Sequence, residues 1–159
     1  MEPSDGLTVD EVELGIRSVI ITHGWAGMAI FDPDAHRKSW FYTVGFSEWG
    51  HPEVVIFDLP PQVAHGIAQT MAESIRMGVT YHPDNTYYDV LSDGLPVAIV
   101  KVDDPFNDEY PLAMSRRLYG QSIEAIQVVW PGEDHLFPWS GTTNPRCRDQ
   151  RLFGTWRGE

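Results

Sequence analysis

The order of helix and strand patterns along this chain is the feature that most restricts its fold. The expected order is α-β-β-β-α-β-β-α-β, with strands at residues 25–31, 40–46, 54–58, 87–91, 96–102 and 125–130. Neighbouring strands have no helix between them except across the second and third helices. Such an order favours a mostly antiparallel sheet over a doubly wound parallel one. We therefore predict an α+β fold in which two to three helices cover a curled sheet, with a barrel-like closure as the variant.

Local signals define the three helices. Thr8 and Glu11 form the spacing of a capping box, and an apolar stripe with a 3.6-residue period then runs through His23 to Gly24. The first helix is therefore predicted at about residues 9–23, ended by a left-handed glycine. A second helix begins at the prolines 60–61 and ends at Gly78, and a third is expected over residues 111–119.

Length and charge restrict the class of protein. The 159 residues suit one domain, and we expect residues 1–7 to be flexible and residues 133–159 to form a largely irregular tail. The formal net charge of −12 makes nucleic acid an unfavourable partner, because phosphate is usually met by clustered Lys and Arg. Neither a secretory signal nor an apolar run long enough to cross a membrane is visible. The expected location is the cytoplasm, with no membrane partner.

Recognised catalytic motifs are missing from the sequence. It contains no Gly-rich phosphate loop, no nucleophile elbow and no zinc-protease helix, so no cofactor is assigned. Cys147 is the single cysteine; Arg146 and Arg148 beside it are expected to lower its pKa, in a loop where the thiol is exposed. The six histidines show no ligand spacing, and no metal site is assigned. His65 is expected at the surface of its helix.

A histidine and a carboxylate separated by one residue form the most specific candidate site in the sequence. The segment Tyr42–Phe46 reads as a strand, and His51, Pro52 and Glu53 follow at the start of the next strand. Three interpretations remain open. Pro52 and Glu53 can form a structural turn in which Glu53 accepts hydrogen bonds from amides of the preceding loop. His51 and Glu53 can bind a ligand together with Tyr42 and Thr43, or they can act as a base with its orienting carboxylate.

Two tryptophans beside prolines form a second candidate. Trp130 and Trp139 occur in the segments 127–131 and 137–139, which predict a rigid aromatic corner that stacks a flat ligand, or a lid over one end of the core. Gln127 is a polar amide within the apolar run 125–129 and needs hydrogen-bond partners if it is buried. A shared ligand site requires that these residues converge with His51 and Glu53 on one cleft.

These motifs resemble a known bacterial family. The ordered series Y-T-V-G-F, H-P-E, V-V-I-F, a helix ended by glycine, Q-V-V-W-P, F-P-W and a late Gln150 with Leu152 is similar to the family called domain of unknown function 4262. The resemblance extends from about Val12 to Gly154. The ending departs from the family pattern, because Gln150 is followed by Arg151 where proline is expected. The resemblance implies a single-domain cytoplasmic protein and carries over no activity.

Three functional hypotheses follow. The first is a module that binds a small molecule or a protein through the candidate residues Tyr42, Thr43, His51, Glu53, Gln127, Trp130 and Trp139. The second is an enzyme with a His–carboxylate site, with or without a metal. The third is an acidic mimic of nucleic acid that blocks a DNA-binding partner; it requires carboxylates arrayed on one face, whereas the sequence distributes them among helix ends and turns.

Overall fold

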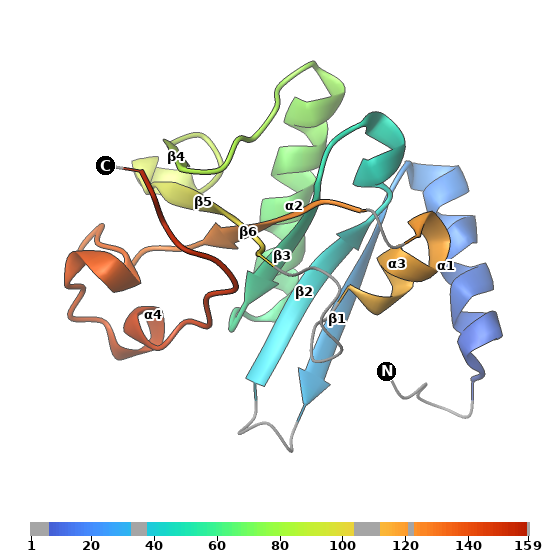
Figure 1. The fold of residues 1–159 in the computed structure, drawn as a ribbon, viewed down its shortest axis with the longest axis horizontal. Coiled ribbons are helices and arrows are strands. Elements are labelled where there is room, and N and C mark those ends of the chain that lie inside the picture. The colour runs from blue at the N-terminus through green and yellow to red at the C-terminus, as the bar shows by residue number, and fades with distance from the viewer. Residues whose placement is uncertain (1–6, 33–37, 104–111, 121–122, 159) are drawn as a thin grey trace.

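The computed structural model describes residues 7–32, 38–103, 112–120 and 123–158. It is an α+β fold in which one sheet lies between helices on both of its faces (Figure 1). The helices are α1 (Val9–His23), α2 (Pro61–Arg76), α3 (Ala113–Tyr119) and α4 (Pro145–Arg148). The strands are β1 (Ala26–Asp32), β2 (Lys38–Val44), β3 (Glu53–Phe57), β4 (Asn85–Tyr87), β5 (Val97–Lys101) and β6 (Ala125–Val129). Three 3-10 turns complete the described elements: η3 (Phe46–Trp49), η4 (Ser92–Gly94) and η5 (Pro138–Ser140).

The sheet consists of two antiparallel three-stranded units joined by one parallel pair. The strand order is β1-β2-β3-β6-β5-β4, and only β3 and β6 run parallel. The predicted α+β fold with a mostly antiparallel sheet is therefore confirmed. The barrel-like variant is wrong, because the central β3–β6 pair leaves β1 and β4 at opposite edges of an open sheet.

The two faces of the sheet are covered by different elements. Helix α2 packs on one face, where Ile67, Ala68 and Met71 meet strand residues such as Val54 and Ile126. Helices α1 and α3 cover β1–β3 on the opposite face. The C-terminal segment covers the remaining part of that face, over β5 and β6. Figure 1 shows this segment, in orange and red, at the end of the molecule away from α1.

Helix α1 begins and ends as its sequence predicts. The Thr8 hydroxyl accepts from the Glu11 amide, the Glu11 carboxylate accepts from the Thr8 amide, and Gly24 is left-handed with φ 92°. Ile16 is the one buried residue of the helix. His23, which the sequence places on the apolar stripe, is exposed. The reason is that α1 contacts the edge of the sheet and buries only a narrow stripe.

Other sequence expectations hold less closely. Strand β4 covers only Asn85–Tyr87, because the chain turns away after Tyr87 pairs with Val97. The predicted tail, as far as residue 158, contains only two short helical turns, η5 and α4. Of the predicted flexible N-terminus, residues 1–6 lie outside the described part of the chain. None of the described helices is long and apolar enough to span a bilayer.

Candidate functional site

Glu53 is the buried polar residue at the centre of the candidate site. Its carboxylate accepts hydrogen bonds from the amides of Gly45, Phe46 and Ser47, at 3.2, 3.1 and 2.9 Å. The hydroxyls of Thr43 and Ser47 also donate to it, each at 2.7 Å. Of the interpretations left open by the sequence, the structural one describes this geometry: Glu53 binds the amides that begin the η3 turn.

Local backbone geometry explains why the carboxylate has so many donors. Gly45 has φ 129°, a conformation that side chains rarely tolerate, and a Cβ there would lie 2.9 Å from the Trp25 Cα. This conformation points three successive amides at Glu53. Burial raises the pKa of the Glu53 carboxyl, while the hydrogen bonds from Ser47, Thr43 and the main chain oppose that shift.

His51 is held by main-chain groups on both of its ring nitrogens. Nε2 lies 3.1 Å from the Tyr81 amide and accepts its hydrogen, so Nδ1 carries the proton and donates to the Pro52 carbonyl at 2.8 Å. Burial lowers the pKa of the imidazole. Both nitrogens of this neutral ring are therefore engaged inside the protein. His51 and Glu53 therefore bind different partners rather than each other.

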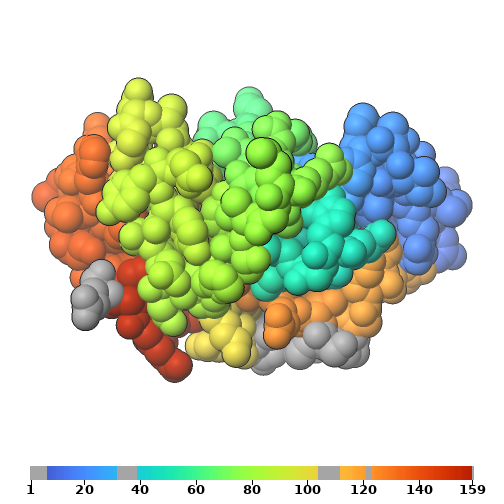
Figure 2. Space-filling model, turned by 90° about the horizontal axis from the view of Figure 1, so that it is seen from above, coloured from blue at the N-terminus to red at the C-terminus, as the bar shows by residue number. Residues whose placement is uncertain are grey.

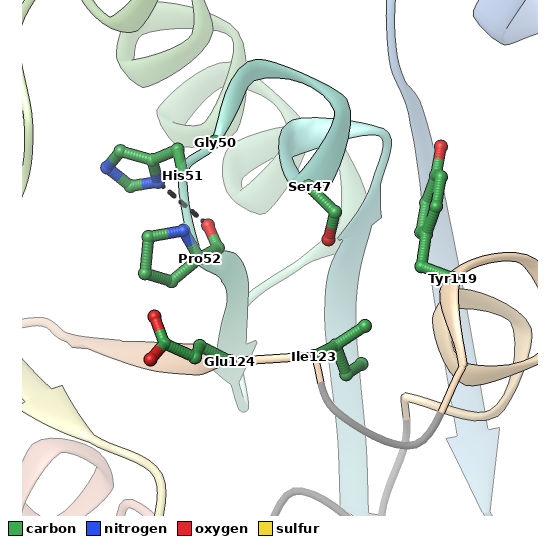
Figure 3. A pocket seen from close by; sticks show the side chains of 7 residues that line it. All are labelled: Ser47, Gly50, His51, Pro52, Tyr119, Ile123 and Glu124. Carbon is green, nitrogen blue, oxygen red and sulfur yellow. Dashed lines mark hydrogen bonds between the residues drawn. The ribbon is translucent and has the colours of Figure 1, made fainter.

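A cavity of about 400 Å³ opens beside this arrangement (Figure 3). It lies at the amino ends of the parallel strands β3 and β6, where the η3 turn approaches the end of α3. Figure 3 shows the Ser47 hydroxyl directed toward Ile123, with Tyr119 on one side and Pro52 and Glu124 on the other. The lining residues are Ser47, Gly50, His51, Pro52, Tyr119, Ile123 and Glu124.

The polar side chains of this cavity present acceptors rather than donors. The Ser47 hydroxyl donates its proton to Glu53, and the Tyr119 hydroxyl donates to the exposed carboxylate of Glu48. Burial, together with that bond to Glu48, raises the pKa of the Tyr119 hydroxyl. The oxygens of Ser47, Tyr119 and Glu124 therefore remain available to accept hydrogen bonds from a ligand.

The predicted site residues do not converge on one cleft. Thr43 and Glu53 are directly bonded, and His51 lies two residues before Glu53, but Tyr42 points to the other face of β2 from Thr43, and Gln127 binds the C-terminal segment. Strand alternation separates Tyr42 from Thr43. Gln127 faces the same side of the sheet as Glu53, but it lies two residues further along the parallel strand β6. The Tyr42 hydroxyl accepts from the Met114 amide, and burial raises its pKa to about 12.

The aromatic corner is also not assembled. Trp130 packs on the α2 face and donates to the Phe57 carbonyl, whereas Trp139 stacks between Phe137 and Trp156 on the opposite face. Trp130 follows the carboxyl end of β6, about five residues, or roughly 17 Å, from the cavity at its amino end. The prediction of a shared aromatic site is therefore wrong. Both tryptophans cover core instead.

Cys147 differs from its sequence-based interpretation. The thiol is buried, and its Sγ lies 3.3 Å from the Trp130 carbonyl oxygen. Burial raises the pKa of the thiol, so the expected lowering by the neighbouring arginines is wrong. Among the described residues, no three His, Cys, Asp or Glu side chains come close enough to hold a metal ion.

Sequence reasoning missed most of the cavity lining. Ser47 directly follows the Y-T-V-G-F motif, and its position one residue beyond the motif was the available signal. Ile123 and Glu124 reach the cavity because β6 pairs with β3, and Tyr119 reaches it at the end of α3. That pairing joins segments about 70 residues apart in the chain, and local patterns carry no information about it.

The structure is thus a single mixed sheet with a polar pocket at the amino ends of its central strands β3 and β6. The family model described as "Domain of unknown function (DUF4262)" matches residues 19–144. The chain therefore belongs to that family, as the sequence motifs indicated. No curated protein and no solved structure matches the chain.

Proposed function

We propose that this chain is a binding protein for a small molecule that carries hydrogen-bond donors, such as an ammonium group. The ligand enters the cavity between η3, the end of α3 and the start of β6. The observation that carries the proposal is that the Ser47 and Tyr119 hydroxyls already donate hydrogen bonds to carboxylates of the protein. A ligand that forms a hydrogen bond with either hydroxyl oxygen must therefore be the donor.

Charge supports the same class of ligand. Glu124 is exposed at the cavity wall, and Glu48 lies behind the Tyr119 hydroxyl. No Lys or Arg is among the described residues that line the cavity. A cation is attracted to this wall and an anion is repelled. His51 contributes shape rather than a base, since both its nitrogens already have partners.

Three probes of matched size test the proposal. Benzylammonium, benzyl alcohol and benzoate are titrated into ¹⁵N-labelled protein, and the amide shifts of Ser47, Gly50 and Glu124 are followed. Benzylammonium is expected to shift these amides at lower concentration than the other two probes. Equal shifts by benzyl alcohol, or none by benzylammonium, would contradict the proposal.

Two conservative variants localise the binding. Glu124→Gln removes the exposed charge and should weaken benzylammonium about three- to fivefold, the range of an exposed ion pair. Tyr119→Phe removes one acceptor and should weaken it about fivefold. Glu133→Gln removes a carboxylate that is also exposed but lies in the C-terminal segment, and it should leave the affinity unchanged.

A further inference from the structure

A second cavity, of about 360 Å³, lies on the other side of the η3 turn, between α1, β1 and α2. Figure 2 views the molecule from the end to which η3 belongs and shows α1, in blue, at one extremity, set off from α2. The residues that line the cavity are Val19, His23, Trp25, Ala26, Gly27, His65, Gln69 and Arg76. Arg76 and two histidines are thus the ionisable groups among them, in a chain of net charge −12.

Arg76 is fixed in place without a carboxylate partner. Its guanidinium donates to the His23 carbonyl at the end of α1 and stacks over the Trp49 ring, 4.7 Å from the ring centre. Within the described residues it forms no ion pair. Gly24 makes this position accessible, because a Cβ there would lie 1.7 Å from Arg76 Nη2. Arg76 therefore keeps donors that no protein anion satisfies.

His65 is fixed by aromatic packing rather than by hydrogen bonds. Its ring stacks on Trp25 at 5.2 Å with an interplanar angle of 27°, and meets Phe41 edge-on at 6.0 Å. No described group hydrogen-bonds to its ring nitrogens, which remain available to a ligand. His23 lies on the opposite wall, and its exposed ring likewise has no hydrogen bond from the described residues.

The remaining lining groups limit what the cavity accepts. Gln69 donates to Glu73 within α2, so this carboxylate is already engaged, and it does not line the cavity. Val19, Trp25 and Ala26 provide the apolar part of the lining. An ammonium ligand is repelled by Arg76, whereas an oxyanion can accept charge-assisted hydrogen bonds from it.

We propose that this cavity binds a small organic oxyanion, a carboxylate or a phosphate, through Arg76, His65 and His23, with its apolar part against Trp25 and Val19. This site is separate from the cavity around Ser47 and does not depend on the function proposed there. The opposite charge of the two cavities allows separate tests with the same family of probes.

Benzoate, inorganic phosphate and benzyl alcohol are titrated into the ¹⁵N-labelled full chain, and the amides of Trp25, Gly27 and Gln69 are followed. Benzoate should shift them at lower concentration than benzyl alcohol. Phosphate distinguishes the two sources of oxyanion: binding tighter than benzoate indicates a phosphate ligand, and weaker binding indicates an organic acid. Shifts by neither anion, or equal shifts by benzyl alcohol, would overturn the proposal.

Variants test the roles of Arg76 and His65. Arg76→Gln should weaken benzoate roughly tenfold, and His65→Gln about threefold. The matched control is Arg146→Gln, which removes another exposed arginine that donates to a main-chain carbonyl, that of Asp58. The proposal fails if Arg146→Gln weakens benzoate as much as Arg76→Gln does. If Arg76→Gln does not fold, His65→Gln and Arg76→Lys decide, and benzoate affinities equal to wild type in both variants overturn the proposal.

Discussion

At the scale of single residues, His51 is a structural imidazole whose protonation opposes folding. Its Nε2 accepts from the Tyr81 amide, and protonation of that nitrogen breaks the bond. The pKa is lowered by burial from the ordinary value of 6.5. The unfolded chain therefore binds a proton near pH 6.5 that the folded chain rejects. The stabilising contribution is present above pH 6.5 and is lost as pH falls below it toward the folded pKa.

The variant His51→Phe tests this assignment. It keeps a buried ring but removes both the acceptor for Tyr81 and the titration. Unfolding in urea should give a free energy about 1–3 kcal/mol lower than wild type at pH 7, because a buried amide loses its partner. The difference from wild type should shrink as pH falls below 6.5. The control His135→Asn changes an exposed histidine in the C-terminal segment, retains His51 and should keep the acid-dependent loss of stability. A variant difference that is constant with pH contradicts the assignment.

At the scale of elements, the C-terminal segment is bound to β6 by two glutamines. The Gln127 amide donates to the Arg151 carbonyl and accepts from the Phe153 amide at 2.9 Å. The Gln150 side chain accepts from the Trp130 amide at 3.0 Å and donates to the Trp130 carbonyl at 2.8 Å. Each amide side chain thus imitates a strand partner, and the irregular tail is fixed without being a strand.

Gln127→Met is expected to loosen this attachment. The change preserves volume but leaves the Phe153 amide without its acceptor, at a cost of about 1–3 kcal/mol in the free energy of unfolding. Hydrogen exchange should become faster at residues 151–154 and remain unchanged in α2. Gln62→Met, on the exposed start of α2, is the control and should change stability by less than about 0.5 kcal/mol. Unchanged exchange at residues 151–154 would show that other contacts hold the segment.

Local sequence predicts where the helices and strands lie, but it does not predict which segments they contact. The capping box at Thr8, the prolines before α2 and the apolar runs of β3 and β6 were sufficient to locate helices and strands. The burial of Gln127 was signalled by the apolar run around it. Its partners at Arg151 and Phe153 were not, because they lie in a segment with no periodic pattern. The parallel pairing of β3 with β6 was likewise invisible locally.

At the scale of the whole molecule, many of the carboxylates behind the high negative charge form local ion pairs and hydrogen bonds. Asp10 and Glu13 both bind Arg117, Glu11 caps α1, and Asp134 accepts from the Thr143 amide and the Thr142 hydroxyl. Glu11 and Asp134 thus stabilise a helix start and a loop, whereas Asp10 and Glu13 join α1 to α3. The cavity around Arg76 is locally positive, and the net charge of the whole chain gives no indication of it. For the same reason, composition predicted which partners are unfavourable but not where a ligand binds.

The η3 turn connects the two cavities, and Glu53 fixes that turn. Ser47 and Gly50 line the cavity near α3, and Trp49 of the same turn supports Arg76 in the other. One buried carboxylate thus positions a wall of each cavity through the amides of Gly45, Phe46 and Ser47. Loosening this turn should therefore affect two ligands of opposite charge, even though Glu53 lines neither cavity.

Glu53→Gln is the corresponding experiment. The new amide group faces main-chain donors and loses charge-assisted hydrogen bonds, which should lower the free energy of unfolding by about 2–3 kcal/mol. In the folded variant, verified by circular dichroism, the affinities for benzylammonium and benzoate should both fall. Gln127→Met destabilises the attachment of the C-terminal segment, at a residue that lines neither cavity, and should leave both affinities unchanged. Loss of one affinity alone in Glu53→Gln, or of both in Gln127→Met, would contradict the role of η3, because the first result separates the two walls and the second attributes the loss to general instability.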